Sequence, residues 1–207
     1  DETMNGRSIR YPRGKTLGGS SAINGLLYIR GQSRDYDVWR QLGNTGWGWD
    51  DVLPYFIKAE NQERGKNEFH GTGGPLSVSD QRIQLPLLNE FQNAAEEFGI
   101  PKTKDFNTGD NNGCGYFQVT EKDGFRCSTA VGYLNPIKKR GNLKIITNAH
   151  VKKINFQNKI AKEVEYWQDN EVKKLVVNRE IILSSGSIGS PQILQTSGIG
   201  NANKLSN

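Results

Sequence analysis

The sequence predicts a mixed α/β fold (α+β), with helices and glycine-rich loops in its first two thirds and short strands in its last third. Apolar residues recur at helical spacing before residue 140, and β-branched segments separated by polar turns follow. The apolar run at residues 181–183 suits a buried strand that leads into a helix start, a natural place for a nucleotide. A chain of 207 residues can bury the core of one large or two small domains.

Three helices are expected in the first half of the chain, at residues 33–42, 49–61 and 85–98. Aspartates in the first turn of the second helix complement the helix dipole. The third helix is expected to stop at Gly99, because glycine is a usual residue after a helix end. A short extended segment at residues 76–78 and a polar, glycine-rich loop at 105–115 complete this region.

The second half begins with an expected helix at residues 128–139, which Pro136 interrupts and the basic cluster Lys138-Lys139-Arg140 ends. Five β-branched segments follow as expected strands, at residues 143–147, 151–156, 164–167, 175–177 and 180–183. A last helix is predicted at residues 191–196.

The segment from Gly14 to Gly25 is the most informative feature of the chain. Its glycines let backbone N–H groups approach a ligand, its serine and asparagine side chains add hydrogen bonds, and convergent amides bind an anionic group. Gly-Lys-Thr copies the end of a nucleotide phosphate-binding loop, but that motif needs a glycine where this chain has Ile9. The segment is therefore either a tight turn with an asparagine cap or a site for a bulky anionic cofactor.

Two stretches resemble the two signatures of the glucose–methanol–choline (GMC) flavoprotein oxidoreductases. The first runs from Gly14 to Asp37 and the second from Gly186 to Gly200. They occur in the order and separation of that family, and the resemblance covers essentially the whole chain. Residues 47–56 and 70–76 look most like the bacterial choline dehydrogenase branch.

The resemblance implies an FAD-binding fold whose flavin and substrate domains interleave along the chain. Residues 1–35 and 141–207 correspond to the flavin domain, and residues 36–140 mainly to the substrate domain. Ten positions match cofactor-binding residues of the family: Gly18, Gly19, Ser20, Asn24 and Gly25 along the diphosphate and flavin, Leu26 and Leu27 beside the isoalloxazine ring, and Val151, Ser185 and Gly186 near the adenosine.

The resemblance also implies noncovalent FAD, because Ile23 stands where some relatives carry a flavin-attaching histidine. No catalytic residue is assigned in this chain. The histidine base of the family lies well beyond the second signature, so His70 and His150 are expected to be structural. The Gly-x-Gly-x-x-Gly unit with which the family begins is missing too, so we expect an internal piece of a longer enzyme, without turnover of its own.

The predicted function is that of an FAD-dependent alcohol dehydrogenase, which oxidises choline or another primary alcohol by hydride transfer to flavin. Two alternatives stay open: a lyase that keeps the flavin structurally, and a noncatalytic flavin-binding module. Trp39, Trp47 and Trp49 are candidates for a cage around a quaternary ammonium, but packing between helices is the favoured role. The sequence decides neither the alcohol nor the electron acceptor.

Composition limits the other classes of partner and site. The net charge is +5, but no aromatic residues are interleaved with its densest basic cluster, so no nucleic-acid partner is expected. Cys114 and Cys127 lack Cys-x-x-Cys spacing, which favours two free thiols over a zinc site or redox pair; no metal is expected. No apolar run reaches the ~18 residues of a membrane span. A cytoplasmic location is expected, and peripheral association with the inner membrane stays open.

Overall fold

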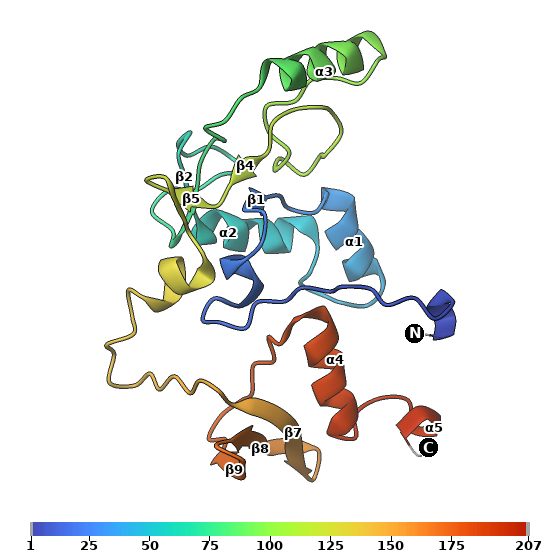
Figure 1. The fold of residues 1–207 in the computed structure, drawn as a ribbon, viewed down its shortest axis with the longest axis vertical. Helices are drawn as coiled ribbons and strands as arrows, with labels where there is room; N and C mark the ends of the chain where they lie inside the picture. Colours follow the sequence, from blue (N-terminus) through green and yellow to red (C-terminus); the bar gives the residue numbers. More distant parts are fainter. Residues whose placement is uncertain (1, 206–207) are drawn as a thin grey trace. The chain divides into compact units, whose positions relative to one another are not determined.

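The computed structural model describes residues 2–205 and divides the chain into two compact units, Asp1–Leu143 and Lys144–Asn207 (Figure 1). We call them the loop unit and the sheet unit. Helices and strands occur in both, which confirms the mixed α/β fold class. The assignment of residues 1–35 and 141–207 to one flavin domain stays a prediction, and residues 1, 206 and 207 of those ranges lie outside the described residues.

The helices of the loop unit begin and end at local sequence signals. They are the short 3₁₀ turns η1 (Glu2–Met4) and η2 (Gly19–Ala22) and the α-helices α1 (Ser33–Gln41), α2 (Trp49–Ala59) and α3 (Pro86–Glu97). At the start of α1, the Gln32 N–H donates to Asp35 Oδ2 at 2.8 Å. At the start of α2, the Gly48 N–H donates to Asp51 Oδ2 at 3.0 Å, so that a carboxylate caps each helix. After α3, Gly99 has a φ of +94°, which confirms the predicted stop.

The second predicted helix ends two residues earlier than expected, because its last residues belong to a strand. β2 (Glu60–Gln62) pairs in parallel with β3 (Leu76–Val78), the extended segment predicted at 76–78. Glu60 and Gln62 are buried while Asn61 between them is exposed, which is the period-two pattern of a strand. The pairing with β3 therefore overrides the helical pattern of the sequence.

A second pair of strands joins this core. β1 (Leu27–Tyr28) pairs antiparallel with β4 (Gln118–Val119), and Val119 also bridges Ser79, just beyond the end of β3. β1 follows the predicted cofactor loop directly. The strand pairs thus attach that loop to the centre of the loop unit.

A hairpin follows β4 and was not predicted. It consists of β5 (Glu121–Lys122) and β6 (Phe125–Arg126), joined by Asp123 and Gly124 with φ values of +53° and +80°. Asp-Gly at positive φ is a common two-residue hairpin turn, so the sequence contained a signal for it.

Aromatic side chains pack α1 against α2. The Tyr36 ring lies 5.4 Å from Trp39, 5.8 Å from Trp49 and 5.7 Å from Phe56, measured between centroids. Trp39 and Trp47 are 6.0 Å apart in an edge-to-face arrangement. The tryptophans therefore pack helices together, which was the favoured role.

The interior of the loop unit combines few apolar side chains with many polar ones. Its buried apolar side chains are Val78, Ala95, Phe106, Val119 and Cys127. Its buried polar side chains are Arg30, Glu60, Gln62, His70, Ser79, Asn107, Gln118 and Ser128. All of these polar side chains except Ser79 form hydrogen bonds, so the packing here is directional as well as apolar.

The helix predicted at residues 128–139 is much shorter than expected. Only η3 (Ala130–Leu134), one π-helical turn, is regular, and residues 135–139 form turns. Pro136 has no N–H with which to continue a helix. The cluster Lys138-Lys139-Arg140 consequently lies at a turn and not at a helix end.

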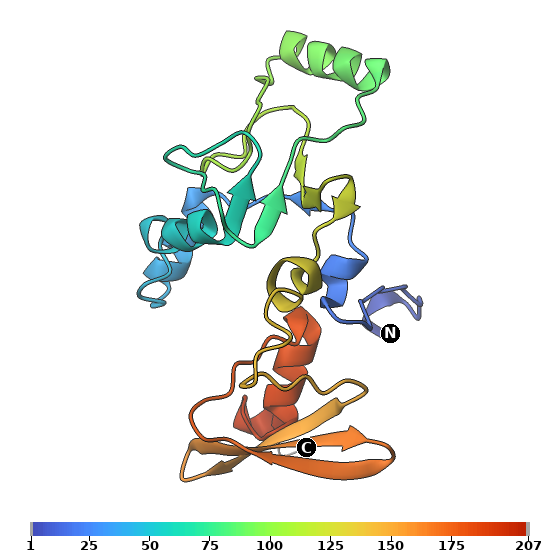
Figure 2. The same cartoon turned by 90° about the vertical axis from the view of Figure 1, so that its left-hand side faces the viewer.

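The sheet unit is an antiparallel three-stranded sheet with a helix beside it (Figure 2). Its elements are β7 (His150–Gln157), β8 (Ile160–Gln168), β9 (Glu171–Val176), α4 (Gly186–Thr196) and the short α5 (Ala202–Leu205). The end of α4 is tied to β7, because Thr196 Oγ1 donates to the Lys152 carbonyl at 3.0 Å and the Ile154 N–H donates to Ser197 Oγ at 2.8 Å. Three predicted strands and the last helix are confirmed, with the helix starting five residues early.

Two predicted strands are wrong. Residues 143–147 and 180–183 have no regular secondary structure and pair with no strand among the described residues. Ile182, expected inside a buried strand, is 79% exposed. A β-branched apolar run becomes a strand only where a neighbour accepts its backbone hydrogen bonds, and residues 2–205 supply none here.

Candidate cofactor site

The predicted cofactor loop has a backbone that requires three of its glycines. Gly18 and Gly19 have φ values of +92° and +54°, in the left-handed region that favours glycine. Gly14 is required for another reason, since a Cβ there would lie 2.1 Å from the Gly19 carbonyl oxygen. The fold of the chain itself therefore explains these three positions.

Gly25 has no such explanation within the described chain. Its φ is not in the left-handed region, and a Cβ added to it would meet no atom within 4 Å. Glycine at such a position suits the close approach of a ligand to the backbone. Gly25 is therefore the predicted cofactor glycine of this loop whose identity the contacts of the chain do not explain.

The polar side chains of the loop stabilise its shape. Ser20 Oγ accepts the Gly14 N–H at 3.2 Å, and Ser21 Oγ donates to the Gly18 carbonyl at 2.5 Å. Asn24 Oδ1 accepts the Leu26 N–H at 3.2 Å. These bonds form the tight turn that was the alternative interpretation, and the binding of a cofactor by the same loop stays a prediction.

Three distant residues hold the loop, and none of them was predicted. The Thr129 N–H donates to Ser21 Oγ at 3.0 Å, and Arg126 Nη1 donates to Asn24 Oδ1 at 2.7 Å. The Thr120 N–H and hydroxyl both donate to the Leu26 carbonyl, at 2.8 and 3.1 Å. Contacts between residues about a hundred positions apart leave no pattern in the local sequence. For Arg126 one signal was available, because the Asp-Gly turn predicts the β5–β6 hairpin in which it lies.

Leu26 and Leu27 connect the loop to β1. Leu26 has a φ of +69°, a conformation that costs a non-glycine residue ~1–2 kcal/mol. The two bonds from Thr120 hold it there. Strain of this kind concentrates at functional sites. Leu27, half exposed at 52%, presents an apolar side chain beside the loop.

The other three predicted cofactor residues belong to the sheet unit. Val151 lies in β7 opposite Tyr166 of β8. Ser185 precedes α4 and its N–H donates to Ser190 Oγ at 3.0 Å. Gly186, the first residue of α4, has a φ of +83°, which explains its identity. The structure thus brings the seven residues from Gly18 to Leu27 into one loop and sets Ser185 and Gly186 at one helix start.

The two histidines differ in their surroundings. His150 is exposed at the start of β7. His70 is 2% exposed, with Nδ1 donating to Glu60 Oε1 and Nε2 donating to Asp105 Oδ2, both at 2.8 Å. Glu60 also forms an ion pair with Arg30 at 2.9 Å. His70 therefore lies within a buried ion cluster that the sequence did not reveal, and its structural role stays a prediction.

The charges of this cluster stabilise one another. Burial opposes the charge on His70, but the hydrogen bonds to Asp105 and Glu60 outweigh it and raise its pKa to about 9. Burial likewise opposes the negative charge on Glu60 and on Asp105. For Glu60, the hydrogen bond from His70 and the charge of Arg30 outweigh burial and keep its pKa below the usual value. Hydrogen bonds from His70 and the Asn107 N–H do the same for the pKa of Asp105. At neutral pH all four groups are charged.

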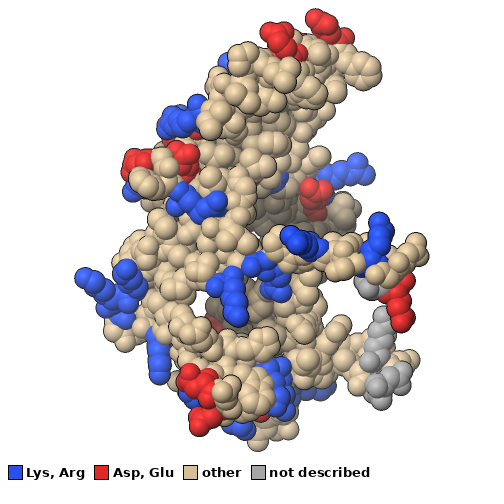
Figure 3. Space-filling view, in the orientation of Figure 1, with Lys and Arg blue, Asp and Glu red and all other residues tan. Residues whose placement is uncertain are grey.

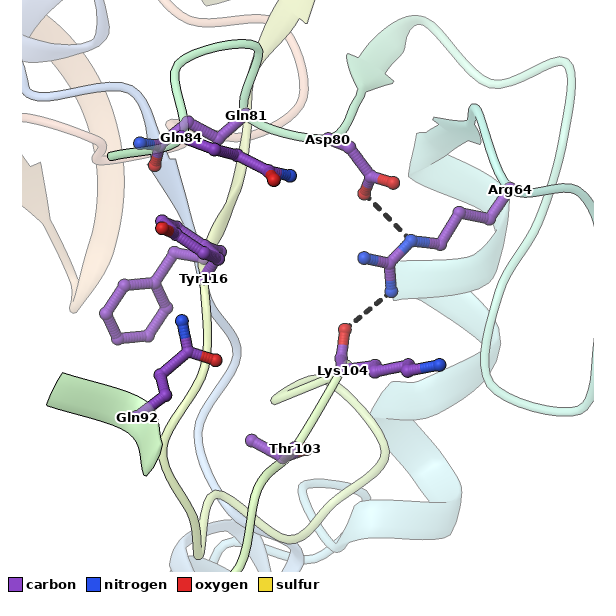
Figure 4. Close-up of a pocket in the computed structure, with 9 residues that line it drawn as sticks. Arg64, Asp80, Gln81, Gln84, Gln92, Thr103, Lys104 and Tyr116 are labelled. Atoms are coloured by element: carbon purple, nitrogen blue, oxygen red, sulfur yellow. Dashed lines mark hydrogen bonds and ion pairs between the residues drawn. The ribbon is translucent and has the colours of Figure 1, made fainter. Parts of the chain in front are cut away.

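A separate polar cavity of about 190 Å³ lies in the loop unit (Figure 4). Its lining residues are Arg64, Asp80, Gln81, Gln84, Gln92, Thr103, Lys104, Tyr116 and Phe117. Arg64 borders it, paired with Asp80 at 2.8 Å and donating to the Lys104 carbonyl at 2.6 Å. None of the predicted cofactor residues lines this cavity, so it is no part of the loop site.

The surface gives two further observations. On the face shown in Figure 3, lysine and arginine side chains are scattered among uncharged residues and do not form one continuous patch. Among the described helices, none has the length and apolar character needed to cross a membrane.

The family is established by comparison with known proteins. The model of the GMC oxidoreductase family matches residues 2–207, and the chain belongs to this family. It is 42% identical to a mitochondrial choline dehydrogenase of Mus musculus, over 98% of this chain and 34% of the relative. It is 43% identical to an alcohol dehydrogenase [acceptor] of Pseudomonas putida, over 98% of this chain and 37% of the relative. An oxygen-dependent choline dehydrogenase of Vibrio vulnificus is 43% identical over 95% of this chain and 36% of its own length.

Solved structures of the same kind confirm the fold. A pyridoxine 4-oxidase from Mesorbium loti superimposes with a TM-score of 0.90 at 30% identity, over 98% of this chain and 40% of the other. An FAD-dependent oxidoreductase from Chaetomium thermophilum superimposes with a TM-score of 0.89 at 32% identity, over 98% of this chain and 37% of the other. The chain thus spans a little over a third of the length of these relatives.

Proposed function

We propose that the chain forms part of an FAD-dependent alcohol dehydrogenase that oxidises choline or another primary alcohol. Membership of the GMC oxidoreductase family and the relatives named choline dehydrogenase and alcohol dehydrogenase support the reaction class. The structural neighbour described as an FAD-dependent oxidoreductase supports the cofactor. Within the chain, the observation that carries the proposal is the preformed loop with an open glycine at Gly25.

FAD would supply the redox chemistry, as the acceptor of a hydride from the alcohol carbon. The residues of the chain would bind and orient it. Backbone N–H groups around Gly18, Gly19 and Gly25 would bind the diphosphate and flavin end, with Ser20 and Asn24 beside them. Leu26 and Leu27 would place apolar side chains next to the ring and exclude water there. In the sheet unit, Val151, Ser185 and Gly186 would bind near the adenosine.

A glycine comparison tests the cofactor site. In the whole protein, Gly25→Ala should weaken FAD binding at least tenfold, because the new methyl group occupies the space proposed for the ligand. Its stability should stay within ~0.5 kcal/mol of the wild type, since the methyl group meets no protein atom. Gly141→Ala is the matched control, because a Cβ at Gly141 also meets nothing within 4 Å. FAD titration by flavin fluorescence and urea unfolding measure the two quantities. Unchanged FAD affinity in the Gly25→Ala protein would show that the site is assigned wrongly.

An anaerobic experiment tests the reaction. Choline or another primary alcohol should bleach the flavin absorbance of the whole protein, whereas a lyase or a noncatalytic module would keep the flavin oxidised. The 207-residue chain alone should show no dye-linked turnover. Reoxidation by oxygen or by a dye would identify the class of acceptor, and sedimentation with lipid vesicles would test peripheral membrane association.

The proposed FAD is noncovalent. Ile23 stands at the position that the resemblance assigns to a flavin-attaching histidine in some relatives, and its side chain has no nucleophilic atom. Acid precipitation of the whole protein should leave the flavin in the supernatant. Flavin that stays with the precipitate would contradict this part of the proposal.

A further inference from the structure

The buried ion cluster of the loop unit has no role in the function proposed above. We call it the Arg30 cluster and define it as Arg30, Glu60, His70, Asp105 and Asn107. Besides its ion pair with Glu60, Arg30 uses Nη1 to donate to the Phe69 carbonyl at 2.7 Å and the Asn107 carbonyl at 3.2 Å. The side chains of Arg30, Glu60 and His70 are 1%, 0% and 2% exposed, whereas that of Asp105, at the edge of the cluster, is 22% exposed.

The Arg30 cluster is attached directly to β1, the strand that follows the cofactor loop. The Arg30 N–H donates to Asn107 Oδ1 at 2.8 Å, and Arg30 Nε donates to the Tyr28 hydroxyl at 3.3 Å. Asn107 Nδ2 donates to the Tyr28 carbonyl at 3.4 Å. On the other side, β4 pairs with β1 and Thr120 holds the Leu26 carbonyl. The position of Leu26 to Tyr28 is thus fixed from two sides.

Stability alone does not explain three buried charges at this place, with the partly exposed Asp105 beside them. Replacing a buried ion pair by apolar residues of similar volume is often neutral or stabilising, so a charged cluster is a poor device for stability. Charged hydrogen bonds are directional, and the planar guanidinium of Arg30 accepts only a narrow set of partner positions. Such a cluster specifies one geometry for the segments that it joins.

We propose that Arg30 and His70 are positioning residues for the cofactor loop: through the Arg30 cluster they hold β1, and with it Leu26 and Leu27, in the place that the bound flavin requires. Arg30 acts on β1 directly, and His70 acts through Glu60, which it shares with Arg30. This inference rests on the proposed function, because it assumes that Leu26 and Leu27 lie beside the flavin.

The Arg30→Lys variant of the whole protein tests the proposal. Lysine keeps the charge but loses the fork that reaches Glu60, Phe69 and Asn107 together. We expect FAD to bind at least tenfold more weakly and the visible circular dichroism of the bound flavin to change. Hydrogen exchange in the protein without FAD should become at least tenfold faster at the N–H groups of Leu26 and Thr120. Exchange at Phe98 and Ile100, which bond to α3, should stay unchanged.

Ala95→Gly is the matched control, because it weakens a buried position of the same unit in α3, away from β1. It should speed exchange at Phe98 and Ile100, leave Leu26 and Thr120 unchanged, and alter FAD affinity less than threefold. Equal effects of both variants on FAD affinity would overturn the proposal, since a general loss of stability would then suffice. Unchanged exchange and FAD affinity in Arg30→Lys would overturn it as well.

His70→Gln gives a milder variant if Arg30→Lys fails to fold. Glutamine can replace one of the two hydrogen bonds of His70, so the same amides should exchange faster, by at least threefold. Unchanged exchange at Leu26 and Thr120 would contradict the role of His70. Failure of the wild-type protein to bind FAD would reject the proposed function instead, and would reject the cofactor part of this inference with it. The exchange result would still decide whether the cluster holds β1.

Discussion

The two segments that resemble the signatures of the family are stabilised to different degrees. In residues 14–28 the turns are held by Thr120, Arg126 and Thr129, about a hundred residues further along the chain. In residues 186–200 the helix α4 is regular, but residues 180–183, which lead into this signature, pair with no strand among the described residues. A motif therefore defines a local backbone only where other parts of the chain supply its partners.

The ion pairs of the two units differ in the same way. Arg30 and Glu60 of the loop unit are almost completely buried, whereas in the sheet unit Lys174 pairs with Glu163 at 3.1 Å while its own side chain is 57% exposed. Water screens the second pair but not the first. Removing one partner should therefore have very different consequences in the two units.

The largest expected effect comes from removing the shared carboxylate of the Arg30 cluster. Glu60→Ala should lower the free energy of unfolding of the loop unit by about 3–5 kcal/mol, because it leaves Arg30 and His70 buried without their partner. Lys174→Ala in the sheet unit should cost far less, because that pair is open to water. Urea unfolding followed by tryptophan fluorescence and far-UV circular dichroism measures both. Similar losses for the two variants would remove the distinction between the units.

A smaller effect is expected from pH. The pKa of His70 is raised to about 9, so its stabilising contribution is complete below the ordinary value of about 6.5 and is lost as the pH rises through 9. The pKa values of Glu60 and Asp105 are lowered, so their contributions are present above about pH 4 and are lost as the pH falls. The urea midpoint of the loop unit should therefore fall between pH 6 and pH 10. His70→Gln should flatten that decline; an equally steep decline in this variant would assign it to other groups.

The sequence predicted the elements whose causes are local. Apolar residues at helical spacing, with residues that favour a helix start or stop, predicted α1, α2 and α3. Polar turns between β-branched segments predicted β7, β8 and β9. The two unpaired segments, at 143–147 and 180–183, were predicted wrongly because β-propensity describes a suitable surface and not the presence of a neighbouring strand. For residues 60–62, pairing with β3 likewise decided the structure.

The candidate site was predictable to a similar extent. Paired glycines at 18 and 19 signal a special backbone, and the structure gives both a positive φ. Thr120 and Thr129 could not be found, because their hydrogen bonds join positions far apart in the sequence. The Arg30 cluster was missed for the same reason: a lone histidine and a lone arginine carry no periodicity, and only the fold shows that they share Glu60.

The smallest expected effect concerns the exposed apolar run that leads into the second signature. Ile182→Thr should change the free energy of unfolding of the 207-residue chain by no more than ~0.5 kcal/mol, because the side chain is 79% exposed and there is little buried area to lose. Ile154→Thr, at a buried position of β7, is the control and should cost several times more. Thermal and urea unfolding of the two variants measure the difference. A loss above 1 kcal/mol for Ile182→Thr would mean that residues 180–183 pack in solution, and that the segment leading into the second signature is held by contacts with the rest of the chain.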